Sequence, residues 1–197
     1  MPKVPRTRSG ERREQILEEA LALFAEHGIQ GVSTRAIAHS VGISQPSLYA
    51  HFATRDEIAM ELCVRAFGRL HARLITASIV RGTPADRLLR LAREYVDFGL
   101  EHEAMYRVAF MIDQPDNSSG QESPVLAAGL RAFSVLLDLF VEVRGAHDVT
   151  TAAMAQSTWA AMHGLVALLL VRHEFPWVER ETLVDIHLTR LCRGAFS

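Results

Sequence analysis

Apolar residues recur every three to four positions along most of the chain, and no stretch keeps the strict alternation expected of a β-strand. The spacing predicts a first helix over residues 10–27, with Ser9 before it as a cap and Gly28 after it as a stop. Further helices are expected at 34–41, 45–51, 56–80, from 84 onward, and at 103–112, 124–144, 149–172 and 178–193. The chain is therefore expected to be all-α, with nine helices.

The 197 residues are enough for one sizeable domain or for a small domain joined to a larger one. A boundary is expected near residue 54, with an N-terminal arm and a small helical domain at 1–54 and a larger helical domain at 55–197. Residues 113–122 are polar and contain Pro and Gly, which predicts a flexible loop. The net charge of −2 excludes a uniformly basic nucleic-acid coat, although a modestly basic head precedes an acidic body.

The composition disfavours several classes of protein. Cys63 and Cys192 lie far apart without CxxC spacing, so neither a disulfide scaffold nor a zinc knuckle is predicted. The charged N-terminus has no apolar run, so we expect no secretory signal and a cytoplasmic location. Residues 149–171 carry no Asp, Glu, Lys or Arg and are long enough to span a bilayer. Because polar side chains interrupt this stretch, we expect a helix buried in an interface and no membrane contact.

Signatures of catalysis and metal binding are missing from the sequence. The nine histidines show neither HxxxH nor HExxH spacing, and GxGxxG, P-loop and GxSxG patterns do not occur. We therefore expect no catalytic residue, no metal and no cofactor.

Residues 34–51, TRAIAHSVGISQPSLYAH, have the pattern of a helix-turn-helix. Such a motif needs a small residue where the helices touch and a glycine where φ is positive, here Ala38 and Gly42. The second helix then presents hydrogen-bonding side chains that can read base edges, and the N–H groups at its start, with Ser44, suit a phosphate oxygen. The alternative is that 34–51 are two capped helices of a bundle whose polar residues simply face water.

From about Arg13 to Leu62 the sequence resembles the TetR family of bacterial transcriptional repressors. The matching segments are Leu-Phe-Ala-Glu-His-Gly at 23–28, Ser-Thr-Arg-Ala-Ile-Ala at 33–38, Val-Gly-Ile-Ser at 41–44, Ser-Leu-Tyr-Ala-His-Phe at 47–52, and Arg-Asp-Glu at 55–57. The resemblance implies a three-helix DNA-binding head with a helix-turn-helix, joined to a helical body that binds a ligand and forms a dimer.

Carried over residue by residue, the resemblance assigns roles within the head. Thr34 would hold a phosphate, and Arg35 would reach a phosphate or a base. Arg55 stands where the family often has lysine and would pair with a backbone phosphate. The residues that would face the major groove and its walls are Gln45, Pro46, Ser47, Tyr49 and His51.

The body resembles the family less closely. Trp159, His163 and Gly164 look like the Trp…His-Gly motif of one C-terminal subgroup, although a core histidine beside a tryptophan explains the same spacing. Candidate ligand-binding residues are Tyr95, Phe98, Met105, Tyr106, Phe110, Met111, Phe133, Leu137, Trp159 and His163. Their aromatic and thioether character predicts a mainly apolar or aromatic small molecule, and the same side chains would equally fill an ordinary core.

The partners expected are therefore a palindromic DNA duplex, a small-molecule effector of unknown identity and a second copy of the chain. Small residues along 149–172 favour dimer packing through this helix and 178–193. The function expected is a bacterial repressor that a small, mainly apolar or aromatic molecule releases from its palindromic operator, and that is associated with the nucleoid when bound to DNA. Two alternatives stay open: the same fold with a body that binds a protein partner, and an all-α enzyme or metal protein with a fortuitous helix-turn-helix.

Overall fold

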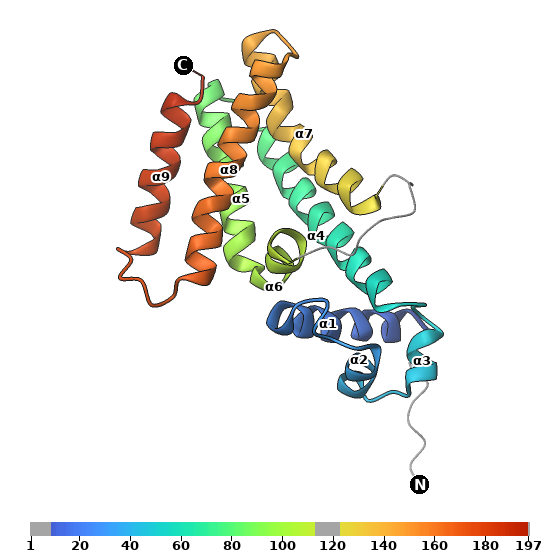
Figure 1. Cartoon of the computed structure of the whole chain (residues 1–197). Helices are drawn as coiled ribbons and strands as arrows, with labels where there is room; N and C mark the ends of the chain where they lie inside the picture. The colour runs from blue at the N-terminus through green and yellow to red at the C-terminus, as the bar shows by residue number, and fades with distance from the viewer. Residues whose placement is uncertain (1–8, 113–122, 197) are drawn as a thin grey trace. The chain divides into compact units, whose positions relative to one another are not determined.

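The computed structural model of the chain describes residues 9–112 and 123–196. These residues form nine α-helices and one π-helical turn, with no strand among them (Figure 1). The helices are α1 (Ser9–His27), α2 (Thr34–Val41), α3 (Gln45–Tyr49), α4 (Arg55–Ser78), α5 (Pro84–Glu101), α6 (Glu103–Tyr106), α7 (Pro124–Arg144), α8 (Val149–Val171) and α9 (Arg180–Gly194). The predicted all-α class is confirmed for this part of the chain. The basic arm and the predicted loop at 113–122 lie outside the described residues.

The chain divides into two compact units. The first takes the residues up to 66 and those from 104 to 125, and the second takes 67–103 and the residues from 126 onward. Helix α4 runs without a break through residues 66 and 67, so each unit contains part of it. This division by packing falls later than the expected boundary near residue 54, and that boundary stays a prediction.

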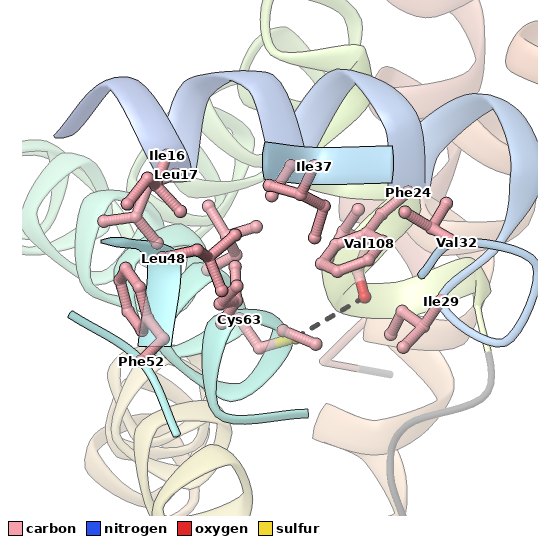
Figure 2. Packing of buried hydrophobic residues seen from close by; sticks show 14 of the residues in the cluster. Ile16, Leu17, Phe24, Ile29, Val32, Ile37, Leu48, Phe52, Cys63 and Val108 are labelled. Atoms are coloured by element: carbon pink, nitrogen blue, oxygen red, sulfur yellow. Dashed lines mark hydrogen bonds between the residues drawn. The ribbon is translucent and has the colours of Figure 1, made fainter. Parts of the chain in front are cut away.

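The core of the first unit explains why the start of α4 belongs to it. Ile16, Leu17 and Phe24 of α1 are buried together with residues of α2, α3 and α4 (Figure 2). Cys63 of α4 is fully buried, and its thiol donates to the carbonyl oxygen of Val108 at 3.6 Å. Each large apolar side chain buried in this way contributes about 1.5–3 kcal/mol to stability. The apolar side chains that recur along α1 therefore face this core.

Serine side chains cap both helices of the helix-turn-helix. Ser33 accepts a hydrogen bond from the N–H of Ala36 at the start of α2, and Ser44 accepts one from the N–H of Ser47 at the start of α3. Gly42 has φ +72°, and the N–H of Ile43 returns to the carbonyl of Ala38 at 2.9 Å. A left-handed residue here lets the chain turn sharply between the two helices.

Three local expectations need correction. Helix α3 ends at Tyr49 instead of about His51, because the N–H of His51 bonds to Leu48 in a tighter turn. The spacing of Thr54 and Glu57 is that of a capping box, and Thr54 accepts a hydrogen bond from the N–H of Glu57. The Glu57 side chain, however, accepts one from the N–H of Ala53 instead of the N–H of Thr54. The helix expected at 103–112 is the short α6 followed by a π-helical turn, Arg107–Met111.

The second unit is built around α5, which packs against both α8 and α9. Thr83 and Asp86 form a complete capping box at its start. Helices α7 and α8 are each long and apolar enough to cross a membrane, and 33% and 39% of their most apolar windows are buried inside the protein. Core helices of a bundle meet the same criterion, so this property is weak support for a membrane protein.

Candidate functional site

Three of the residues expected to bind DNA are joined to one another at the starts of α2 and α3. The amide nitrogen of Gln45 lies 3.1 Å from the hydroxyl oxygen of Thr34 and 3.1 Å from the phenol oxygen of Tyr49. The two hydroxyl oxygens are 3.2 Å apart. We call this set the Thr34–Gln45–Tyr49 triangle. The hydrogen bonds that Tyr49 shares with Thr34 and Gln45 lower its pKa, and Tyr49 is 48% exposed.

The remaining polar groups of α3 surround its N-terminus. The hydroxyls of Ser44 and Ser47 are 2.8 Å apart, and both residues are exposed, as is Pro46. His51 is half-buried in the turn that follows the helix. The structure therefore places the expected groove-facing residues on or directly after one short helix.

The two arginines expected to bind DNA differ in their surroundings. Arg35 is exposed on α2 and forms no salt bridge within the described part of the chain. Arg55 instead donates to the side-chain oxygen of Gln30 at 2.8 Å and to the carbonyls of Gln30 and Val32 at 3.4 Å each. Its guanidinium also pairs with Asp56 at 3.0 Å. Arg55 thus holds the connection between α1 and α2, a role that the sequence did not suggest.

An ion-pair network between α1 and α4 was also missed. Arg13 pairs with Glu61, and its guanidinium carbon lies 4.3 Å from the centre of the Phe52 ring. Arg65 pairs with Glu61 at 2.7 Å and with Glu14 at 2.6 Å. The hydrogen bond from Arg13 lowers the pKa of Glu61. Only the spacing of Glu61 and Arg65, four residues apart, could have indicated part of this network from sequence.

The expected ligand-binding residues are divided between the two units. Met105, Tyr106, Phe110 and Met111 belong to the first unit, and Tyr95, Phe98, Phe133, Leu137, Trp159 and His163 belong to the second. Tyr95, Phe98 and Tyr106 are buried, whereas the others are partly accessible.

Within the second unit Trp159 is the centre of a ring cluster. Its indole N–H donates to the phenol oxygen of Tyr95 at 3.1 Å. The centroids of Phe133 and His163 lie 6.0 and 6.3 Å from the Trp159 ring. Burial lowers the pKa of His163, which favours the neutral imidazole. Trp159 remains 38% exposed, so an aromatic surface is accessible here.

A groove of about 420 Å³ opens elsewhere in the second unit, where the end of α4 and parts of α5 and α9 meet. Val80, Leu89 and Leu188 contribute apolar surface, and Arg93 pairs with Asp185 across it. None of the expected ligand-binding residues lines this groove. Their arrangement around a cavity therefore stays a prediction.

Helices α8 and α9 expose apolar side chains on the second unit. Leu168 is 49% exposed and Ile186 is 53% exposed, and Val149 and Val171 at the two ends of α8 are exposed as well. Among residues 9–112 and 123–196, no three His, Cys, Asp or Glu side chains stand close enough together to hold a metal ion.

Fold and site together define a helix-turn-helix protein with a separate helical body. Residues 16–62 match the family described as bacterial regulatory proteins of the tetR family. Residues 88–191 match the tetracyclin repressor-like C-terminal domain. The chain therefore belongs to the TetR family.

Individual relatives agree with this assignment. Over 104 residues the chain is 30% identical to the uncharacterized HTH-type transcriptional regulator YobS of Bacillus subtilis, covering 53% of this chain and 54% of YobS. Over 77 residues it is 39% identical to the HTH-type transcriptional repressor KstR2 of Mycobacterium tuberculosis, covering 39% of this chain and 38% of KstR2. The chain thus spans about half the length or less of these curated relatives.

The fold of two solved structures matches nearly the whole chain. The ketosteroid transcriptional regulator KstR2 of Mycobacterium tuberculosis aligns with a TM-score of 0.70 at 21% identity, covering 95% of this chain and 96% of that one. The TetR family transcriptional regulator PfmR of Thermus thermophilus aligns with a TM-score of 0.71 at 23% identity, covering 91% and 97%. At these identities the likeness shows the fold. The relatives are transcriptional regulators, and none is named as an enzyme.

Proposed function

We propose that this protein is a transcriptional repressor that binds a palindromic DNA operator as a homodimer and leaves it when a small molecule binds the body. The observation that carries the proposal is the exposed polar set at the starts of α2 and α3, presented by a correctly capped helix-turn-helix. Family membership and the name of the repressor KstR2 support it. A bacterial cytoplasmic location, at the nucleoid when bound to DNA, follows from this role.

The contacts divide into two kinds. Thr34, Arg35 and the N-terminus of α3 at Ser44 would hold phosphates, which fixes the position of the head on the duplex. Gln45, Pro46, Ser47, Tyr49 and His51 would face the major groove. In a two-fold dimer the two copies of α3 must lie about 34–36 Å apart to enter successive major grooves.

The test of DNA binding starts from a pool of random duplexes, because the operator sequence is unknown. The full chain should enrich a palindrome, and its affinity for that duplex should fall steeply as salt rises. Gln45→Ala should weaken binding to the enriched duplex and leave the dimer and the helical content intact. Gln15→Ala is the matched control, since Gln15 is an exposed glutamine of α1 in the same unit. Absence of any enriched sequence would overturn the proposal.

For the effector, the ring cluster around Trp159 supports an apolar or aromatic small molecule. The exposed part of the indole offers a stacking surface, and neutral His163 can bond to a polar group of the molecule. The relative KstR2 is named as a ketosteroid regulator, which is consistent with an apolar ligand. Membership of the Trp…His-Gly subgroup stays a prediction. So does contact of the effector with Met105, Tyr106, Phe110 and Met111.

The dimer is proposed to form through α8 and α9. The exposed apolar side chains of these helices need cover, and the exposed alanines of α8, Ala153 and Ala160, allow another helix to approach closely. Binding of an effector that favours a different separation of the two heads would then shift the population away from the form that holds both half-sites.

A further inference from the structure

The Thr34–Gln45–Tyr49 triangle restricts which end of the Gln45 amide is available to DNA. The three edges of the triangle are the distances among the Gln45 amide nitrogen and the hydroxyl oxygens of Thr34 and Tyr49. They measure 3.1, 3.1 and 3.2 Å, so each is within hydrogen-bond distance. Three such contacts require three protons. Counting the protons that the three side chains supply decides how the amide is oriented.

With the amide nitrogen inside the triangle, the group supplies enough protons. The NH₂ of Gln45 donates one proton to each hydroxyl oxygen, and one of the two hydroxyls donates to the other. With the amide oxygen inside, only the two hydroxyl protons would be present, and one edge would bring two oxygens together without a proton. The nitrogen-inward orientation is therefore the one that satisfies every contact.

This orientation leaves the side-chain oxygen of Gln45 outside the triangle. No group among residues 9–112 and 123–196 donates a hydrogen bond to that oxygen. Both N–H groups of the amide are occupied, so the free side of Gln45 is purely an acceptor. One hydroxyl proton also remains after the three edges are made, and it is free for a phosphate oxygen.

We infer that Thr34 and Tyr49 are positioning residues that turn the oxygen of Gln45 toward the major groove, so that it selects a base carrying an exocyclic amino group. In that groove adenine and cytosine present an amino donor, whereas guanine and thymine present only acceptors at the corresponding positions. A fixed acceptor facing another acceptor loses a hydrogen bond and leaves both groups unsatisfied. The inference rests on the proposed DNA binding and adds the class of base that Gln45 selects.

The experiment measures affinity for the enriched duplex and for duplexes with each base pair changed in turn. Gln45→Leu should abolish the base preference at one position in each half-site, which identifies the base that Gln45 contacts. At that position the wild type should bind adenine or cytosine about tenfold more tightly than guanine or thymine. In Thr34→Val/Tyr49→Phe the amide is released and can also donate. The preference at this position should then fall below about threefold. Gln15→Ala, on α1 and outside the proposed interface, should leave the preference at this position unchanged.

A base analogue separates this contact from a two-point contact with adenine. If the preferred base is adenine, 7-deazaadenine should bind wild type equally well, because no amide proton is free for the missing N7 atom. In the double variant the same replacement should weaken binding.

A measurement on the free protein makes the test independent of DNA. The two side-chain amide protons of Gln45 should exchange slowly with water in ¹⁵N-labelled wild type and rapidly in Thr34→Val/Tyr49→Phe, whose melting temperature shows whether it folds. Rapid exchange in wild type would overturn the triangle. A preference for guanine or thymine at the Gln45 position would overturn the orientation, and an unchanged preference in the double variant would overturn the positioning role. A wild type that enriches no duplex overturns the proposed function and this inference with it, whatever the exchange shows.

Discussion

Arg55 shows how neighbouring acceptors decide what a single charged side chain does. The resemblance assigns it to a phosphate, but its guanidinium reaches Gln30, Val32 and Asp56. Lysine has a single charged nitrogen and cannot bridge acceptors spread around a planar group. Arg55→Lys should therefore lower the free energy of unfolding by about 1 kcal/mol in urea titrations.

The same variant separates the two roles in DNA binding. Since lysine keeps the positive charge, the salt dependence of operator binding should not change in Arg55→Lys. In Arg55→Met the slope of log affinity against log salt should fall by about one only if Arg55 contacts a phosphate. An unchanged stability in Arg55→Lys would contradict the structural role.

Glu61 gives a prediction on pH. Hydrogen bonding from Arg13 lowers the pKa of Glu61 in the folded protein. A carboxyl group with a lowered pKa stabilises the fold above its unfolded pKa, about 4.3, and the contribution disappears as pH falls through the folded value. Glu61→Gln should be less stable than wild type by about 1 kcal/mol at pH 7, and the difference should vanish in acid. Urea titrations at a series of pH values measure it, and a difference independent of pH would contradict the ion-pair explanation.

At the scale of elements, the sequence predicts what depends on local chemistry. The N-caps are residues of the types that favour this position, namely Ser33, Ser44 and Thr83, and Gly42 takes the left-handed turn conformation that glycine favours. A cap can be predicted because it involves groups only three or four residues apart. The end of α3 and the π-helical turn after α6 were not predicted. The ion pairs Arg13–Glu61 and Arg93–Asp185 join residues far apart in the sequence, so local spacing could not predict them.

Two glycines in different elements should respond to alanine in opposite directions. Gly42 has φ +72°, and nothing lies within 4 Å of an added Cβ. Gly42→Ala should therefore lower the free energy of unfolding by about 1 kcal/mol through backbone strain alone. Gly68 lies exposed within α4, also with nothing within 4 Å of an added Cβ. Gly68→Ala should raise the free energy of unfolding by about 0.5–1 kcal/mol, because alanine favours a helix. Thermal unfolding of both variants is the measurement. A stabilised Gly42→Ala would show that the turn does not need the left-handed conformation.

At the scale of the whole molecule, the proposed dimer predicts which exposed leucines and isoleucines matter. Ile186→Glu places a charge on the exposed apolar face of α9 and should convert the dimer to a monomer in sedimentation experiments at micromolar concentration. Leu126→Glu is the control, because Leu126 is 57% exposed but lies on α7. Loss of the dimer in Leu126→Glu but not in Ile186→Glu would place the interface elsewhere.

The response to effector can be tested because the chain has only two tryptophans. In a Trp177→Phe background the fluorescence reports on Trp159 alone, so a compound that stacks on the ring cluster should change its emission and raise the melting temperature. The proposed coupling requires that the same compound weaken operator binding, by roughly 5–150-fold for a typical coupling of about 1–3 kcal/mol. This coupling is reciprocal by thermodynamic linkage, so a saturating concentration of operator must lower the affinity of the protein for the compound by the same factor. A compound that changes Trp159 emission but leaves operator affinity unaltered would show that the ring cluster binds ligands without controlling the head.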